Sequence, residues 1–109
     1  AKDMAFLFSD ALKQMPYTLE ATSHKTLKFD SLSGLIHEAE NTNKIVDSIP
    51  ALIGGKTGFT DLAGGNLVLA FDAGIMRPII ISVLGSTKEG RFKDMEAIVW
   101  ATLEYIKHE

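Results

Sequence analysis

The feature that most constrains the fold is a pair of segments that are apolar at most of their positions. Residues 66–71 and 76–84 place leucine, isoleucine, valine and phenylalanine on both alternating faces of an extended chain. An antiparallel sheet with one face in water would instead show polar residues at every second position. Both faces must therefore be covered, which predicts a three-layer sandwich with helices on either side of a sheet.

The same sheet is expected to contain a third strand around Lys56. Turn-forming residues at 61–65 and 72–74 separate the three extended segments. These connections are too short for parallel crossovers, so the strands are predicted to form an antiparallel meander.

A separate β-hairpin is predicted upstream, because residues 24–29 and 35–40 flank a turn-like segment. Glu38 and Glu40 share one face of its second strand. A carboxylate pair can serve acid–base chemistry, but two solvated surface acids are the more common case, and we expect the latter.

Helices are predicted at both ends of the chain, over residues 1–15 and 91–107. Apolar residues recur there at helical spacing, and Pro16 is expected to end the first helix. The apolar residues of the first are Met4, Phe6, Leu7, Phe8, Ala11, Leu12 and Met15, and those of the second are Phe92, Met95, Ile98, Val99, Thr102, Leu103 and Ile106. The predicted class is α+β, an antiparallel sheet covered by helices, in one domain spanning residues 1–109.

Composition excludes several classes of function. The chain has 109 residues, a net charge of −3 and no cysteine. Acids and bases are interspersed, so no nucleic-acid partner is expected, and neither a disulfide nor a thiolate nucleophile is available. No metal site is expected, because His24, His37 and His108 lack the paired spacing of ligands on one element.

The segment 53–61 concentrates three glycines, Lys56 and two threonines. Glycine lets a ligand approach the backbone, and lysine and threonine donate hydrogen bonds, so an anion is the expected guest. A phosphate-binding P-loop is excluded, because its first glycine would fall on Pro50 and a strand-like segment follows instead of a helix. The alternative is the Lys-Thr-Gly element of serine penicillin-recognising enzymes, which lies on a strand.

The surroundings of this element extend the match. Asn41-Thr42-Asn43, residues 54–68, Met76-Arg77 and Arg91-Phe92 occur in an order that resembles the D-alanyl-D-alanine carboxypeptidases, the low-molecular-mass penicillin-binding proteins. The likeness is strong over residues 41–106 and looser before that. It implies part of the penicillin-binding-protein/β-lactamase-like transpeptidase fold.

The resemblance also implies roles for individual residues. Lys56 would lie at the active-site edge, Thr57 would bind the substrate carboxylate, and Gly58 would keep the strand bare. The Phe59 N–H would be an oxyanion-hole donor, although many relatives carry histidine there, and Arg91 would help to hold the carboxylate. The alternatives are an ordinary solvated lysine at position 56 and an arginine at position 91 that merely begins a helix.

The implied activity is that of a bacterial, extracytoplasmic serine peptidase without a cofactor. Its substrate would be a peptidoglycan stem peptide ending in D-Ala-D-Ala, and the intact protein would bind β-lactams. The family's Ser-x-x-Lys and Ser-x-Asn motifs do not occur in the chain. We therefore expect the C-terminal part of the catalytic domain, inactive by itself; the alternative is a non-catalytic peptide- or carboxylate-binding or oligomerising module.

Strand pairing gives one further expectation. In the family's fold, strands from the N-terminal part of the domain pair beside the last strand of this chain. Residues 79–84 would otherwise form an apolar edge, and such edges pair with other chains. A homo-oligomer through this edge, or through an uncovered face of the sheet, is therefore expected.

Overall fold

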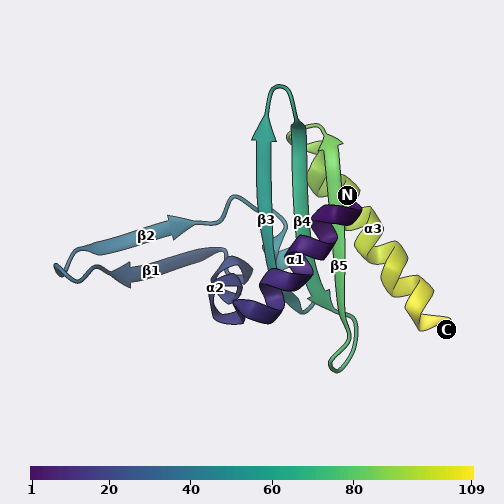
Figure 1. Cartoon of the computed structure of the whole chain (residues 1–109), viewed down its shortest axis with the longest axis horizontal. Coiled ribbons are helices and arrows are strands. Elements are labelled where there is room, and N and C mark those ends of the chain that lie inside the picture. The colour runs from purple at the N-terminus through teal and green to yellow at the C-terminus, as the bar shows by residue number, and fades with distance from the viewer.

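The computed structural model describes all residues from 1 to 109. Three α-helices, two 3₁₀ turns and five strands follow one another along the chain (Figure 1). Their order is α1 (Lys2–Gln14), α2 (Pro16–Glu20), η1 (Ala21–Ser23), β1 (Thr26–Asp30), β2 (Ile36–Glu40), η2 (Val46–Ser48), β3 (Leu52–Thr60), β4 (Gly64–Asp72), β5 (Pro78–Ser86) and α3 (Gly90–Lys107).

The main sheet is the predicted antiparallel meander, in the order β3–β4–β5. β4 lies in the centre and is almost wholly buried, as its apolar sequence requires. It begins at Gly64, earlier than the expected position 66, so Gly64 and Gly65 pair as strand residues.

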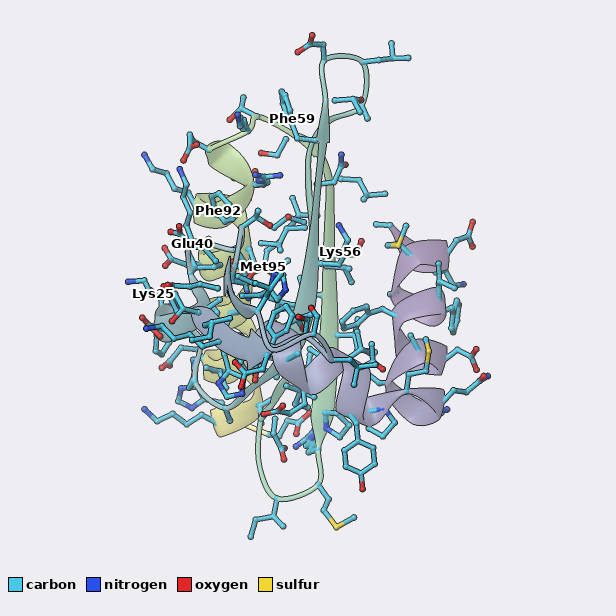
Figure 2. The ribbon with its side chains drawn as sticks, turned by 90° about the vertical axis from the view of Figure 1, so that its left-hand side faces the viewer. Lys25, Glu40, Lys56, Phe59, Phe92 and Met95 are labelled. Carbon is cyan, nitrogen blue, oxygen red and sulfur yellow. The ribbon has the colours of Figure 1, made fainter.

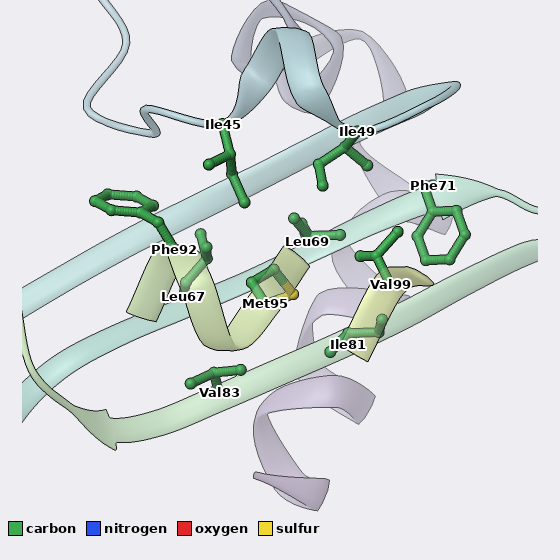
Figure 3. Packing of buried hydrophobic residues seen from close by; sticks show 10 residues of the cluster. All are labelled: Ile45, Ile49, Leu67, Leu69, Phe71, Ile81, Val83, Phe92, Met95 and Val99. Carbon is green, nitrogen blue, oxygen red and sulfur yellow. The ribbon is translucent and has the colours of Figure 1, made fainter. Parts of the chain in front are cut away.

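Helices cover the two faces of this sheet, which confirms the three-layer prediction (Figures 1 and 2). On one face, Leu67, Leu69 and Phe71 of β4 pack with residues of α3, β5 and the loop before β3 in the larger core cluster (Figure 3). On the other face, Val68 and Ala70 pack with Phe8 of α1. The side chains of β4 thus alternate between two separate cores.

The first helix buries a narrower face than the sequence suggested. Phe8 is buried and Leu12 packs beside it, but Phe6 and Leu7 are 64% and 63% exposed. Phe6 and Leu7, counted among the apolar residues of this helix, therefore do not widen the face that it buries, since they lie around the helix from Phe8. Pro16 does end α1, and it also begins α2, where its missing N–H costs no hydrogen bond.

The predicted hairpin is present as β1 and β2, which form a two-stranded sheet of their own. It extends away from the main sheet (Figure 1). Every residue of β2 is exposed, including Glu38 and Glu40, as expected for solvated acids. The apolar residues of the hairpin therefore do not form a buried face.

One close backbone approach fixes where α3 begins. A Cβ on Gly65 would lie 2.0 Å from the carbonyl oxygen of Thr87, in the loop before α3. Only glycine allows β4 and this loop to touch. Gly65 also pairs with Phe59, so this contact lies directly across from the segment 53–61.

No helix combines the length and apolar character that spanning a bilayer requires.

Candidate functional site

The free edge of β3 is the centre of the candidate site. β3 pairs only with β4, and the N–H of Gly55 bonds to the hydroxyl of Thr22 in η1, at 2.9 Å, on the opposite edge. Because backbone groups alternate between the two edges of a strand, Thr57 and Phe59 also present their N–H and C=O groups at this free edge. The edge is thus open at those two residues except for the Thr57 carbonyl, which accepts a hydrogen bond from the Lys56 ammonium.

The glycines of β3 serve different purposes. A Cβ on Gly54 would lie 2.7 Å from the carbonyl oxygen of Leu19 and 2.8 Å from the Thr22 hydroxyl, so this glycine lets α2 and η1 close against the sheet. A Cβ on Gly58 would meet nothing nearer than 3.9 Å. The fold therefore does not demand glycine at position 58, and a bare surface there is available to a ligand.

The loop between the hairpin and β3 reaches Thr57. The hydroxyls of Thr42 and Thr57 lie 2.6 Å apart. Thr57 pairs across the sheet with Leu67, whose side chain belongs to the α3 core. Cross-strand partners share a face, so the Thr57 hydroxyl lies on the α3 side of the sheet.

Lys56 and Arg91 flank β3 from opposite faces. Lys56 pairs with Val68, which faces α1, and its ammonium donates to the Thr57 carbonyl. Arg91 comes from the first turn of α3 on the other face, and its Nη1 donates to the Gly58 carbonyl at 2.9 Å. The structure therefore brings Arg91 and Thr57 to one face and leaves Lys56 on the other.

Arg91 is held in place by more than this bond. It is only 6% exposed, and its guanidinium stacks on the ring of Phe92, 4.7 Å from the centroid. The Gly58 carbonyl is the only hydrogen-bond partner of the guanidinium within the chain, and the buried Nε has none. The guanidinium therefore retains N–H donors that have no partner within the chain.

Positive charge surrounds this face of β3. The Lys88 ammonium lies 5.3 Å from the centroid of the Phe59 ring, and Lys44 bonds both carboxylate oxygens of Glu89 at 3.0 Å. The hydrogen bond from Lys44 lowers the pKa of Glu89, desolvation opposes this shift, and the charges of Lys44, Arg91 and Lys88 lower the pKa further. Three cations thus lie around one acid at this face of β3.

A cavity of about 260 Å³ opens between the hairpin and the edge of β3. Lys56 and Thr57 form its β3 wall and residues of η1 and the hairpin form the other. Its lining residues are Ala21, Thr22, His24, Leu27, Ala39, Glu40, Asn41, Thr42, Gly55, Lys56 and Thr57.

Sequence reasoning gave no role to Thr42, Lys88 or Glu89, which the structure places around β3. Thr42 lies in the Asn-Thr-Asn triplet that carried part of the resemblance, so a signal for it was present. His24 lines this cavity and bonds Glu20 at 2.6 Å, whereas His37 stacks on Phe29 in the hairpin.

The family model for D-alanyl-D-alanine carboxypeptidase matches residues 1–88. No curated protein sequence matched the chain.

Several solved structures are similar to the chain. Penicillin-binding protein D2 of Listeria monocytogenes, solved in a cefotaxime-bound form, is 39% identical over 88% of this chain with a TM-score of 0.72. A mutant of the Streptomyces K15 DD-transpeptidase is 29% identical over 88% of the chain, with a TM-score of 0.73. D-alanyl-D-alanine carboxypeptidase from Mycobacterium tuberculosis is 26% identical over 92%, with a TM-score of 0.66.

The chain spans only part of these proteins, covering 37%, 39% and 38% of their respective lengths. These neighbours show the α+β penicillin-binding-protein fold that the sequence predicted. The match to the family model extends over most of the chain and includes β3, the Thr42 loop and β5. The chain therefore belongs to the D-alanyl-D-alanine carboxypeptidase family.

Proposed function

We propose that the free edge of β3 binds the C-terminal carboxylate of a peptide ending in D-Ala-D-Ala. The observation that carries this proposal is the open edge at Thr57 and Phe59, beside the buried guanidinium of Arg91. An extended peptide can add to such an edge as a further strand. The surrounding cations favour an anionic terminus over a neutral one.

Each side chain then has a defined task. The Thr57 hydroxyl and the Arg91 guanidinium, on the same face, would donate to the carboxylate. The Phe59 N–H, two residues along the edge, would donate to the oxygen of the scissile carbonyl, and Gly58 between them would leave room for the peptide. Lys56 would add positive potential from the α1 face.

The reaction we propose is hydrolysis of the last peptide bond by a serine-type carboxypeptidase. A serine hydroxyl from outside residues 1–109 would attack the carbonyl carbon, and the negative charge that develops on the oxygen would be stabilised by the Phe59 N–H. Collapse would break the C–N bond and release D-alanine, whose amine takes up the proton that the serine hydroxyl gave up, and would leave an acyl-enzyme, which water would hydrolyse to the shortened peptide and free serine. The substrate would be a peptidoglycan stem peptide in the bacterial cell wall, outside the cytoplasmic membrane, and β-lactams would bind at the same edge.

Binding can be tested on the 109-residue chain itself. Titration with N-acetyl-D-alanyl-D-alanine, followed by ¹⁵N-edited NMR, should shift the amide signals of Thr57, Gly58 and Phe59. The same peptide with a C-terminal amide should bind more weakly, because it lacks the charge. Shifts confined to the hairpin or to α3 would contradict the proposal.

Catalysis requires a second test. We propose that the 109-residue chain is not labelled covalently by a fluorescent penicillin, because it contains no Ser-x-x-Lys motif. In a longer protein that contains this motif, Lys56→Ala and Thr57→Val should lower kcat/KM for release of D-alanine. Peptide binding without any turnover in such a protein would instead support a non-catalytic binding module.

A further inference from the structure

The hydroxyls of Thr42 and Thr57 form a contact between a loop and β3 that has no evident role in packing. Thr42 is exposed and belongs to a loop, and the two oxygens are 2.6 Å apart. Neither hydroxyl has another hydrogen bond within the chain. Either hydroxyl can therefore donate the hydrogen bond between them, and its direction depends on what else each oxygen binds.

A proton count answers it when an anion is bound. Each threonine hydroxyl has one proton and can accept from a second donor. If Thr57 donates to a carboxylate, its proton is used, so the short contact is satisfied only when Thr42 donates to Thr57. The resulting chain runs from Thr42 to Thr57 to the anion, and each bond in such a chain polarises the next.

The loop holds Thr42 where this chain can form. The side-chain amide of Asn41 donates to the carbonyls of Thr22, at 2.7 Å, and His24, at 2.9 Å. The Asn41 Oδ1 accepts from the N–H of Asn43 at 2.9 Å, and the Asn43 side chain accepts from the N–H of Ile45. Thr42 thus lies between two anchored asparagines.

We propose that Thr42 is a positioning residue that turns the Thr57 hydroxyl into a donor and thereby selects peptides with a free carboxylate. This inference rests on the proposed function of the β3 edge. It assigns the specificity for an anionic terminus partly to a residue that does not touch the ligand. A neutral C-terminal amide gains less, because it does not require Thr57 to act only as a donor.

The first test measures the orientation of Thr57 without any ligand. Three-bond couplings from the Thr57 Cγ to its backbone N and C′ report the χ1 rotamer. Wild type and Thr42→Ser should show one rotamer, whereas Thr42→Val, which removes the hydroxyl at nearly constant shape, should show averaged couplings. An unchanged Thr57 rotamer in Thr42→Val would overturn the inference.

The second test measures affinity by NMR titration with N-acetyl-D-alanyl-D-alanine and with its C-terminal amide. Thr42→Val should raise the Kd of the acid about five-fold, the loss expected for one hydrogen bond, and should change that of the amide much less. Thr42→Ser should retain the wild-type values, and Thr18→Val, at an exposed position of α2, is the matched control.

The outcomes separate the two proposals. Wild-type affinity for the acid in Thr42→Val would overturn the role of Thr42 while leaving the proposed function in place. Absence of binding by the wild-type chain would count against the proposed function, and the rotamer measurement would then decide the role of Thr42 alone.

Discussion

Arg91 reaches from the first turn of α3 across to β3, where its guanidinium donates to the carbonyl of Gly58 at 2.9 Å. The two residues are far apart in sequence, and this bond joins the helix layer to the strand that carries the candidate site. Because the guanidinium is also stacked on Phe92, its position is determined before any ligand arrives.

Replacing Arg91 should affect both stability and binding. Arg91→Met keeps most of the buried stem but removes the charged hydrogen bond, so we expect a loss of about 1–3 kcal/mol in the free energy of unfolding. Arg91→Lys should be intermediate, since an ammonium lacks the planar fork. Urea denaturation measures the effect, with Lys93→Met at an exposed position of α3 as the control. Equal stability of the Arg91→Met and Lys93→Met variants would contradict the structure.

The glycines of β3 should respond differently to alanine. Gly58→Ala meets only the Asn66 Cβ at 3.9 Å, so stability should change by less than about 1 kcal/mol, while peptide binding should weaken because the strand is no longer bare. Gly54→Ala would press on the Leu19 carbonyl and should destabilise the chain by about 1–3 kcal/mol. Denaturation and NMR titration of both variants check the contrast. Unchanged peptide affinity in Gly58→Ala would argue against binding along this edge.

The pKa of Glu89 should report the cations around it, Lys44, Arg91 and Lys88. Lys44 holds the pKa of this carboxyl below its ordinary value, so Lys44→Met should raise it towards that value. Since the folded-state pKa is lower than the unfolded-state pKa, the stabilisation is complete above the unfolded-state value and is lost as the pH falls through the folded-state value. Carboxyl ¹³C NMR during an acid titration measures the pKa. A Glu89 pKa that stays the same in Lys44→Met would show that the pair is absent in solution, and Lys93→Met is the control.

The β5 edge should mediate self-association. β5 is the other outer strand of the sheet and carries apolar residues on both faces, as the expectation for residues 79–84 required. Alternation from its pairs with β4 places the N–H of Ser82 at the free edge, so Ser82→Pro should weaken association without breaking the β4–β5 ladder. Light scattering over a range of concentrations tests this. A wild-type chain that stays monomeric at high concentration would refute the prediction.

Much of the fold could be predicted from the sequence, because two strands that are apolar on both faces can be packed in few ways. Segments that are apolar on both faces need a layer on each side, and the short turns allow only an antiparallel order. The exposure of Phe6 and Leu7 was not accessible, because helical spacing alone does not show how wide a face the sheet can cover.

The candidate site was only partly accessible. The residue pattern pointed to the segment around Lys56, and alternation along a strand would place Lys56 and Thr57 on opposite faces. It does not say which face α3 occupies, so the hydrogen bond from Arg91 to the Gly58 carbonyl required the structure. Thr42 was equally hidden, since a polar loop has no periodicity that could indicate its neighbour.

The backbone contact between Gly65 and Thr87 fixes the distance between β4 and the loop before α3, because no side chain lies between them. Even one methyl group on residue 65 would push the root of α3 outward, and the guanidinium that it carries would move away from its carbonyl. The position of Arg91 on α3 therefore depends on the absence of a side chain at residue 65, on a strand that Arg91 itself does not bond.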